Sequence, residues 1–194
     1  EVPADASAAG AGTGAGLRLD SGVVDGSVVG IHYDPMLAKV ISWAPRRDDA
    51  AERLATALRG AQIHGVLTNR DLLVRILGHA GFLDGDTDTA FLDRHGLDVL
   101  AAPLADERAT SVSALAGALA MASSNRRDAT VLGDLPSGWR NIVSQPQHKA
   151  FRPLGGAPDA ADIDVAYRLT RDGLHANGHD DVVLVDATPS VVVL

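Results

Sequence analysis

The sequence predicts an α+β fold in which an antiparallel sheet with packed helices precedes a second, strand-rich region around a buried helix. Three observations support this prediction. Alternating or β-branched segments and segments of helical spacing follow one another in residues 17–95. Residues 110–124 are rich in alanine and apolar on most sides, as in a buried helix that a sheet or barrel covers. Short apolar runs between Asp-Gly and Asn-Gly turns in residues 139–194 are typical of an antiparallel meander.

Composition excludes several classes of function. The 194 residues suffice for one large or two small domains, and with 46% hydrophobic but only 4% aromatic residues the core must consist of Ala, Val and Leu. A net charge of −8 without a basic cluster argues against nucleic-acid binding. No apolar run approaches the roughly 20 residues of a membrane helix. The absence of cysteine excludes a thiolate nucleophile and is compatible with a cytoplasmic location.

The first 16 residues are small and glycine-rich, and they are predicted to form a loop. The piece GAGTGAG lacks the preceding strand, the following helix and the Lys-Ser/Thr end of a phosphate-binding loop. The chain opens at Glu1 without a signal peptide and closes on VVVL, so both ends are expected to have been cut from something longer.

Residues 17–95 are predicted to contain strands and helices in alternation. The expected strands are Leu17–Ser21, Ser27–His32, Leu37–Trp43 and Gln62–Leu67, with turns at Asp25-Gly26 and Asp34-Pro35. The expected helices are 46–61, one that starts at Asn69 and stops near Gly78, and 89–95 capped by Asp88. Residues 98–107 form a candidate boundary, after which the helix 110–124 is followed by the expected strands Trp139–Val143, Val165–Thr170, Val182–Asp186 and Ser190–Leu194.

Two constellations resemble metal sites but are better explained otherwise. His175 and His179, with the following Asp180 and Asp181, have ligand-like spacing, yet the intervening Asn-Gly pair predicts a turn that aims the histidines differently. The run Asp84, Asp86 and Asp88 lacks the glycine and glutamate of a calcium loop, so a solvated turn is favoured.

Arg18 is the leading candidate for chemistry. A lone arginine is usually a solvated surface group, but one held on a strand before a glycine-rich bend can present a fixed, permanently charged fork of donors to an oxyanion. Lys39 has a similar ambiguity, since it lies in an apolar strand and either extends to solvent or pairs with Asp34. A structural role is favoured for Lys39.

The segments RLDSGVVDGSVVGIHYDPMLAKVISWAPRRDDA, AERLATALRGAQIHGVLTN and DTDTAFLDRH resemble the C-terminal subdomain of biotin carboxylase, over residues 18 to about 95. The closest likeness is to the α subunits of acyl-CoA carboxylases of the propionyl-, acetyl- and methylcrotonyl-CoA type. The resemblance implies ATP- and bicarbonate-dependent carboxylation of biotin, with biotin and ATP-Mg as cofactors of the complete enzyme. It also implies that Arg18 corresponds to the arginine that stabilises the biotin enolate.

The family's ATP-grasp region is absent, and neither Lys39 nor Lys149 lies between methionines as the biotin acceptor does. The resemblance therefore implies a part of the enzyme that binds no cofactor and is inactive alone. The implied partners are the carboxyltransferase β subunit, the biotin carboxyl carrier domain and other copies of the α subunit.

The expected domains are 1–97, the biotin carboxylase C-terminal subdomain, and 98–194, part of the domain that links it to the carboxyltransferase subunit. This second assignment follows from PSGWRNIVSQPQHKAFR (residues 136–152), because the linking domain in the family is a β-barrel around a long helix. Trp139 and Arg140 are the partner-binding candidates, since Trp and Arg are enriched at interfaces, although Trp139 could equally fill the core. Two alternatives stay open: a non-catalytic module, at least residues 110–194, that docks the β subunit, and a stand-alone α+β protein.

Overall fold

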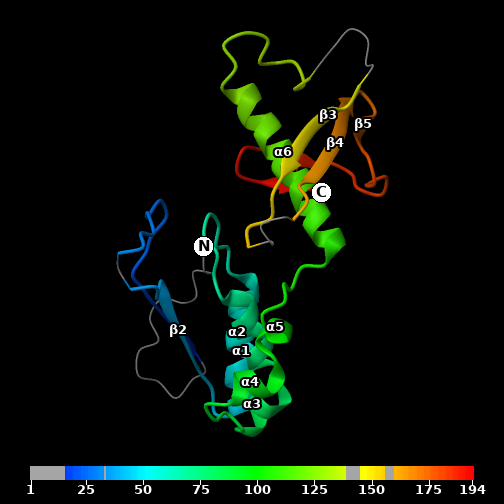
Figure 1. Cartoon of the computed structure of the whole chain (residues 1–194). Helices are drawn as coiled ribbons and strands as arrows, with labels where there is room; N and C mark the ends of the chain where they lie inside the picture. The colour runs from blue at the N-terminus through cyan, green and yellow to red at the C-terminus, as the bar shows by residue number, and fades with distance from the viewer. Residues whose placement is uncertain (1–15, 33, 139–144, 156–159) are drawn as a thin grey trace. The chain divides into compact units, whose positions relative to one another are not determined.

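The computed structural model describes residues 16–32, 34–138, 145–155 and 160–194. The chain divides into two compact units, Glu1–Leu104 and Ala105–Leu194, each with its own hydrophobic core (Figure 1). Both units combine helices with antiparallel strands, which confirms the α+β class at this coarse level. The expected boundary at residue 98 falls inside a short helix of the first unit.

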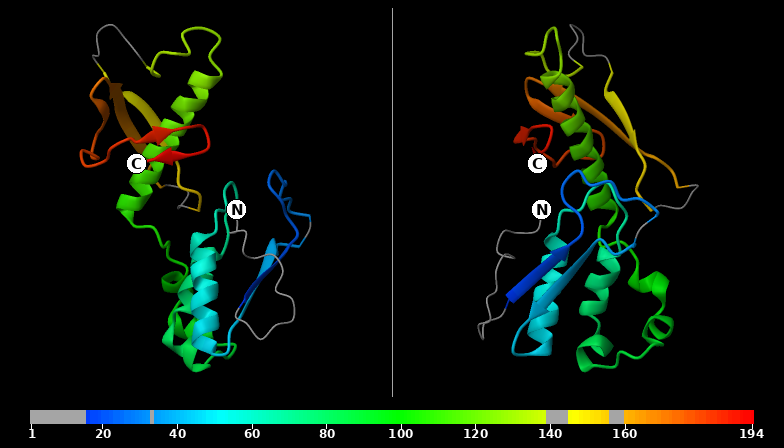
Figure 2. Two further views of the ribbon diagram at one scale, coloured as in Figure 1. Left: turned by 180° about the vertical axis from the view of Figure 1, so that it is seen from behind. Right: turned by 90° about the vertical axis from the view of Figure 1, so that its left-hand side faces the viewer.

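The first unit opens with an antiparallel pair of strands, β1 (Gly16–Ser21) and β2 (Ala38–Trp43). The alternating and β-branched residues of these segments predicted both strands, and both are confirmed. The segment that connects them forms a loop beyond one end of the paired strands (Figure 2). Its expected turn is closed by a hydrogen bond of 3.0 Å from the Ser27 amide to the Val24 carbonyl.

The strand expected at residues 27–32 is wrong. This segment is irregular, and the side chains of Val28 and Ile31 are 95% and 93% exposed. A short strand gains little stability without a hydrogen-bonded neighbour and a buried face, and β1 pairs with β2 instead. The loop consequently carries exposed apolar side chains that no described part of the unit covers.

Helices make up the rest of the described part of the first unit. They are α1 (Arg47–Gly60), α2 (Arg70–Leu77), α3 (Ala80–Asp84), α4 (Phe91–His95) and α5 (Leu97–Leu100). Ala51 and Ala55 of α1 pack with Leu77 of α2 in the core of the unit. The Arg47 guanidinium lies 4.6 Å from the ring centroid of Phe82 and donates two hydrogen bonds to the Phe82 carbonyl, which ties α1 to α3.

Helices α1, α2 and α4 confirm predictions, whereas α3 and α5 were not foreseen. With five and four residues, these two helices are too short for a hydrophobic period to indicate them. The strand expected at 62–67 is wrong, because Gly65 has a φ of 82°, in the left-handed region that interrupts an extended segment.

Helix α6 (Glu107–Arg127) is the central element of the second unit and extends beyond the predicted 110–124 at both ends. Its start is fixed by Asp106, whose side chain accepts a hydrogen bond of 2.7 Å from the Ala109 amide. The buried side chains of α6 lie along one stripe and are Ala114, Leu115, Ala118, Leu119 and Ala122. Met121, by contrast, is 44% exposed, so the described residues do not enclose the helix on all sides.

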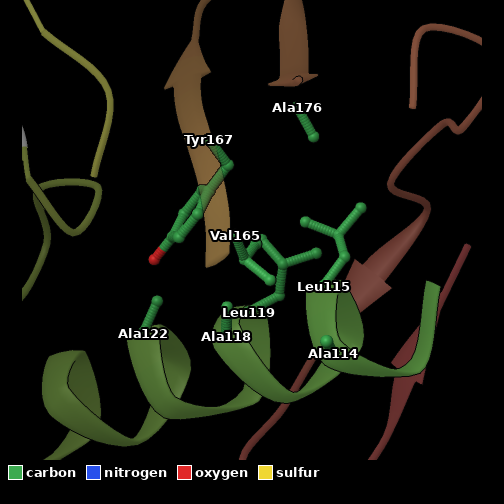
Figure 3. Close-up of a cluster of buried hydrophobic side chains, with 8 residues drawn as sticks. All are labelled: Ala114, Leu115, Ala118, Leu119, Ala122, Val165, Tyr167 and Ala176. Atoms are coloured by element: carbon green, nitrogen blue, oxygen red, sulfur yellow. The ribbon is translucent and has the colours of Figure 1, made fainter. Parts of the chain in front are cut away.

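A three-stranded antiparallel sheet packs against this stripe. Its strands are β3 (Gln147–Phe151), β4 (Ile163–Thr170) and β5 (Gly173–Ala176), with β4 in the middle. Val165 of β4 points toward Leu119 of α6, and the ring of Tyr167 points toward Ala122 (Figure 3). Glycine at position 117 permits the contact with β3, because a Cβ added there would lie 3.3 Å from the Phe151 ring.

A second sheet, formed by β6 (Asp186–Ala187) and β7 (Val192–Val193), also contacts α6. These strands are shorter than the predicted 182–186 and 190–194. Val182 and Leu184 of this segment pack against the core while Val183 and Val185 are exposed, but the pairing of β6 with β7 spans only two residues of each strand. The strand predicted at 139–143 lies outside the described residues, and the described strands form two separate sheets that do not establish a closed barrel.

Two side chains of α2 hold the chain where it leaves the first unit. The Asp71 carboxylate accepts hydrogen bonds from the Leu104 amide at 3.0 Å and from Arg70 Nε at 2.8 Å. The Arg75 guanidinium donates to the carbonyl oxygens of residues 102 and 103, both at 2.9 Å. These bonds attach the exit segment to α2 as far as Leu104.

We expect Leu119→Ala to destabilise the second unit by about 3 kcal/mol, because this fully buried side chain would leave a cavity between α6 and the sheet. Urea unfolding followed by circular dichroism measures the change. Met121→Ala on the exposed side of α6 is the control and should cost about 0.5 kcal/mol or less. Equal losses for both variants would contradict the assignment of the buried stripe.

Asp71→Ala should lower the free energy of unfolding of the first unit by about 1–2 kcal/mol at neutral pH. Partial burial alone would raise the pKa of Asp71, but the hydrogen bonds from Leu104 and Arg70 outweigh it and hold this pKa below its ordinary value. The contribution of Asp71 to the free energy of unfolding is therefore complete at pH values above the ordinary pKa of aspartate. It is lost as the pH falls through the lowered pKa of the folded state.

Urea midpoints of the wild type and the variant should accordingly converge as the pH is lowered from 7 to 3. Glu52→Ala, which removes an exposed acid from α1, is the control and should leave the difference from wild type small at each pH. A gap between wild type and Asp71→Ala that stays constant down to pH 3 would contradict the proposed linkage.

Candidate functional site

Arg18 lies on the exposed face of the β1–β2 pair. The register places Arg18 opposite Ile41 and Asp20 opposite Lys39. Side chains directly across an antiparallel pair share a face, and side chains two residues apart on one strand do so as well. Arg18, Asp20, Lys39 and Ile41 therefore share one face, and the leucines on either side of Arg18 are half-buried on the other.

Asp20 contacts the guanidinium of Arg18 from the same strand. Arg18 Nε lies 3.2 Å from Asp20 Oδ1, and Arg18 Nη2 donates a hydrogen bond of 3.3 Å to Oδ2. The two side chains are 66% and 50% exposed, so this ion pair adds little to stability. The contact uses one edge of the guanidinium. The Nη1 group makes no hydrogen bond within the described residues.

This arrangement suits the binding of an oxyanion. Arginine stays charged at any physiological pH and offers its donors in a planar fork. Asp20 pairs with one edge of the guanidinium, and the Arg18 side chain as a whole is 66% exposed, which leaves donors available on the other edge. Lys39, opposite Asp20 in the register, adds a second cation to the same face, so the face carries two cations and one carboxylate although the chain has a net charge of −8.

Lys39 does not form the ion pair with Asp34 that was one of its two expected roles. Asp34 Oδ1 accepts a hydrogen bond of 2.8 Å from the Met36 amide instead. Lys39 is exposed on β2, and no ion pair of its ammonium group is found in the described part of the chain. The exposure of Lys39 agrees with the other expected role, in which its side chain extends from an apolar strand into solvent.

The structure separates the histidine and aspartate residues of the first metal-like constellation. His175 is exposed on β5, whereas His179 is buried in the following turn, where its Nε2 lies 3.1 Å from the Ser111 hydroxyl. Asp181 accepts a hydrogen bond of 2.7 Å from Arg108, and this bond lowers the pKa of Asp181. Within the described residues no group of three or more such side chains could hold a metal ion.

In the second constellation, one arginine pairs with two of the three aspartates. Arg94 lies within 2.9 Å of Asp88 and 3.4 Å of Asp86. Its hydrogen bond lowers the pKa of Asp88. Asp84 ends α3, and the following Gly85 adopts the left-handed conformation common after a helix. The run is therefore a helix end and a paired loop, in keeping with the preference for a solvated turn.

Other expected features fall outside the described residues. These are nearly all of the GAGTGAG piece and both partner-binding candidates, Trp139 and Arg140. No helix among the described residues is both long enough and apolar enough to span a membrane.

Sequence reasoning singled out Arg18 as a candidate but did not consider Asp20 as its neighbour. The signal was available, because residues two apart on a predicted strand share a face. The pairing of Arg108 with Asp181, 73 residues away, had no such local signal.

Residues 6–94, which include Arg18, match the family described as the biotin carboxylase C-terminal domain. The α subunit of mitochondrial methylcrotonoyl-CoA carboxylase from Rattus norvegicus is 41% identical over 83 residues, which are 43% of this chain and 12% of that protein. The propionyl-CoA carboxylase alpha chain of Ruegeria pomeroyi is 34% identical over 105 residues, 53% of this chain and 15% of that protein. The resemblance stated from the sequence is thereby confirmed.

Among solved structures, the biotin carboxylase domain dimer of Hydrogenobacter thermophilus 2-oxoglutarate carboxylase, in complex with MgADP, ADP and bicarbonate, is 32% identical. The match covers 46% of this chain and 19% of the chain in that structure, with a TM-score of 0.42. This score is too low to support an inference about the fold. The chain thus matches only a small part of the length of the relatives to which it is similar.

Proposed function

We propose that this chain, whose residues 6–94 match the biotin carboxylase C-terminal domain, is part of the α subunit of a biotin-dependent acyl-CoA carboxylase. The observation that carries the proposal is the position of Arg18 within the matched region, on an exposed face of β1 with donors accessible to an anion. In the complete enzyme this segment contributes to the ATP- and bicarbonate-dependent carboxylation of biotin. A cytoplasmic location is part of the proposal.

Arg18 is the proposed catalytic residue. Biotin, when bound, supplies the ureido nitrogen that accepts the carboxyl group. The guanidinium of Arg18 stabilises the negative charge that develops on the adjacent ureido oxygen, because a permanently charged donor fork favours the charged over the neutral oxygen. The described residues fit this role through the exposed edge of the guanidinium and the surplus positive charge of its face.

The remainder of the active site lies in other parts of the proposed protein. The connecting loop of the first unit supports this view, because Val24, Val28 and Ile31 are 80%, 95% and 93% exposed. Three exposed apolar side chains on one loop support a surface that another domain or subunit covers. We assign residues 1–97 to the C-terminal subdomain of biotin carboxylase, with ATP-Mg bound elsewhere in the enzyme.

Residues 98–194 are proposed to be part of the domain that links biotin carboxylase to the carboxyltransferase subunit. The contacts of α6 with β4, β6 and β7 support a barrel that surrounds this helix, with further strands in the remainder of the domain. The proposed partners are the carboxyltransferase β subunit, the biotin carboxyl carrier domain and further copies of the α subunit.

A second candidate function is a non-catalytic module that docks the carboxyltransferase β subunit. The exposure of Val183, Val185 and Val191 by 70%, 72% and 57% favours an interaction surface on the second unit. Trp139 and Arg140 are the contacts proposed from the sequence.

In a complete carboxylase that contains this segment, Arg18→Ala should lower the rate of biotin carboxylation about 100-fold while ATP binding stays unchanged, because a donor to the developing oxyanion is lost. Biotin-dependent release of ADP measures the rate, and a nucleotide titration measures binding. Arg53→Ala, an exposed arginine of α1, is the control and should retain full activity. A carboxylation rate unchanged by Arg18→Ala would remove the assignment.

Trp139→Ala should abolish co-purification of the α subunit with the β subunit if Trp139 is an interface anchor. Its thermal unfolding temperature should then stay close to that of the wild type. The opposite pattern, a large fall in the unfolding temperature with capture retained, would support the alternative in which Trp139 fills the core. Arg140→Ala serves as the neighbouring comparison and should weaken capture without loss of stability.

A further inference from the structure

Asp20 shares the exposed face of the β1–β2 pair with two cations, Arg18 and Lys39. Arg18 reaches it from two residues earlier on the same strand, with contacts of 3.2 and 3.3 Å. Lys39 lies directly opposite it on β2. The carboxylate is half-exposed, and its two oxygens face different atoms of the guanidinium.

We propose that Asp20 is a positioning residue that fixes the orientation of the Arg18 guanidinium for the reaction, an inference that rests on the proposed catalytic role of Arg18. An arginine side chain in solvent samples many rotamers. A two-point contact with a carboxylate limits both the position and the plane of the guanidinium. Asp20 thus reduces the number of arginine conformations before the anion binds.

The edge that Asp20 occupies is compatible with this role. Its contacts involve Nε and Nη2, so Nη1 is not engaged by the carboxylate. A carboxylate across Nη1 and Nη2 would have blocked the outer edge of the guanidinium, which is the edge farthest from the strand. Asp20 therefore holds Arg18 by its inner edge and leaves the outer edge for an oxyanion.

The charge of the face is compatible as well. A carboxylate next to a catalytic cation would normally weaken the attraction of that cation for an anion. Lys39 lies opposite Asp20 and restores a positive balance of two cations to one carboxylate. The pair can thus orient Arg18 without making the face neutral.

The same unit contains a matched ion pair away from this face. Arg46 and Asp48 have the same two-residue spacing, with contacts of 3.0 and 2.7 Å and similar exposure of 71% and 51%. Asp48 lies in the first turn of α1. A variant of Asp48 is therefore the matched control. It removes an exposed Arg–Asp pair of the same spacing and leaves the contact between Arg18 and Asp20 in place.

The test uses a complete biotin carboxylase that contains this segment, with free biotin, ATP-Mg and bicarbonate. Asp20→Asn, Asp20→Ala and Asp20→Glu are made in the wild type, and Asp20→Asn is also made in the Arg18→Ala background. The readouts are kcat and KM for biotin-dependent ADP release, together with ATP hydrolysis in bicarbonate without biotin. Circular dichroism and urea midpoints establish that each variant is folded.

We expect Asp20→Asn and Asp20→Ala to lower kcat by about two- to fivefold, within the range open to an exposed ion pair. KM for ATP and the hydrolysis without biotin should not change. Asp20→Glu should recover part of the lost rate, because it restores a carboxylate. In the Arg18→Ala background Asp20→Asn should have no further effect, and Asp48→Asn should leave kcat unchanged.

The outcomes separate this inference from the proposed function. If Arg18→Ala leaves biotin carboxylation unchanged, the proposed catalytic role fails, and the role of Asp20 fails with it. If Arg18→Ala slows the reaction but Asp20→Asn does not, or slows it equally in both backgrounds, only the positioning role is overturned. A rate that Asp48→Asn lowers as much as Asp20→Asn would also overturn it, because the effect would then be one of general stability.

Discussion

The antiparallel pairing of β1 with β2 is the constraint on which the candidate site depends. Because side chains alternate along a strand, one register decides which residues meet solvent and which face inward. The observed register places Arg18 and Asp20 outside, with Lys39 and Ile41 beside them on the neighbouring strand. A shift by one residue would turn Arg18 toward the half-buried side, so the chemistry of the site is set by backbone hydrogen bonds.

The second unit depends on a different kind of constraint. Helix α6 alternates alanine and leucine along its buried stripe, and the small residues let the sheet approach the helix closely. Tyr167 and Val165 fill the space above the alanines (Figure 3). With few aromatic residues available, this close contact supplies much of the core that larger side chains would otherwise provide.

Much of the fold could be predicted where local patterns are long. The alternation in β1 and the amphipathic spacing of α1 and α2 were sufficient to predict these elements. The segments 27–32 and 62–67 were misjudged because β-branched composition does not create a partner strand, and in the second case Gly65 turns the chain. The placement of Arg18 on a strand could be predicted from the alternation of apolar and polar residues in that segment. The hydrogen bond from Arg108 to Asp181 could not, because it depends on tertiary packing between segments far apart in the sequence.

The clamp formed by Asp71 and Arg75 has a consequence for how the protein can be rearranged. It secures the chain as far as Leu104, and Asp106 already caps α6, so among the described residues only Ala105 lies between these two anchors. A residue inserted at Ala105 would break none of these hydrogen bonds. Ala105 is therefore the position in this segment where an inserted residue disturbs the two anchors least.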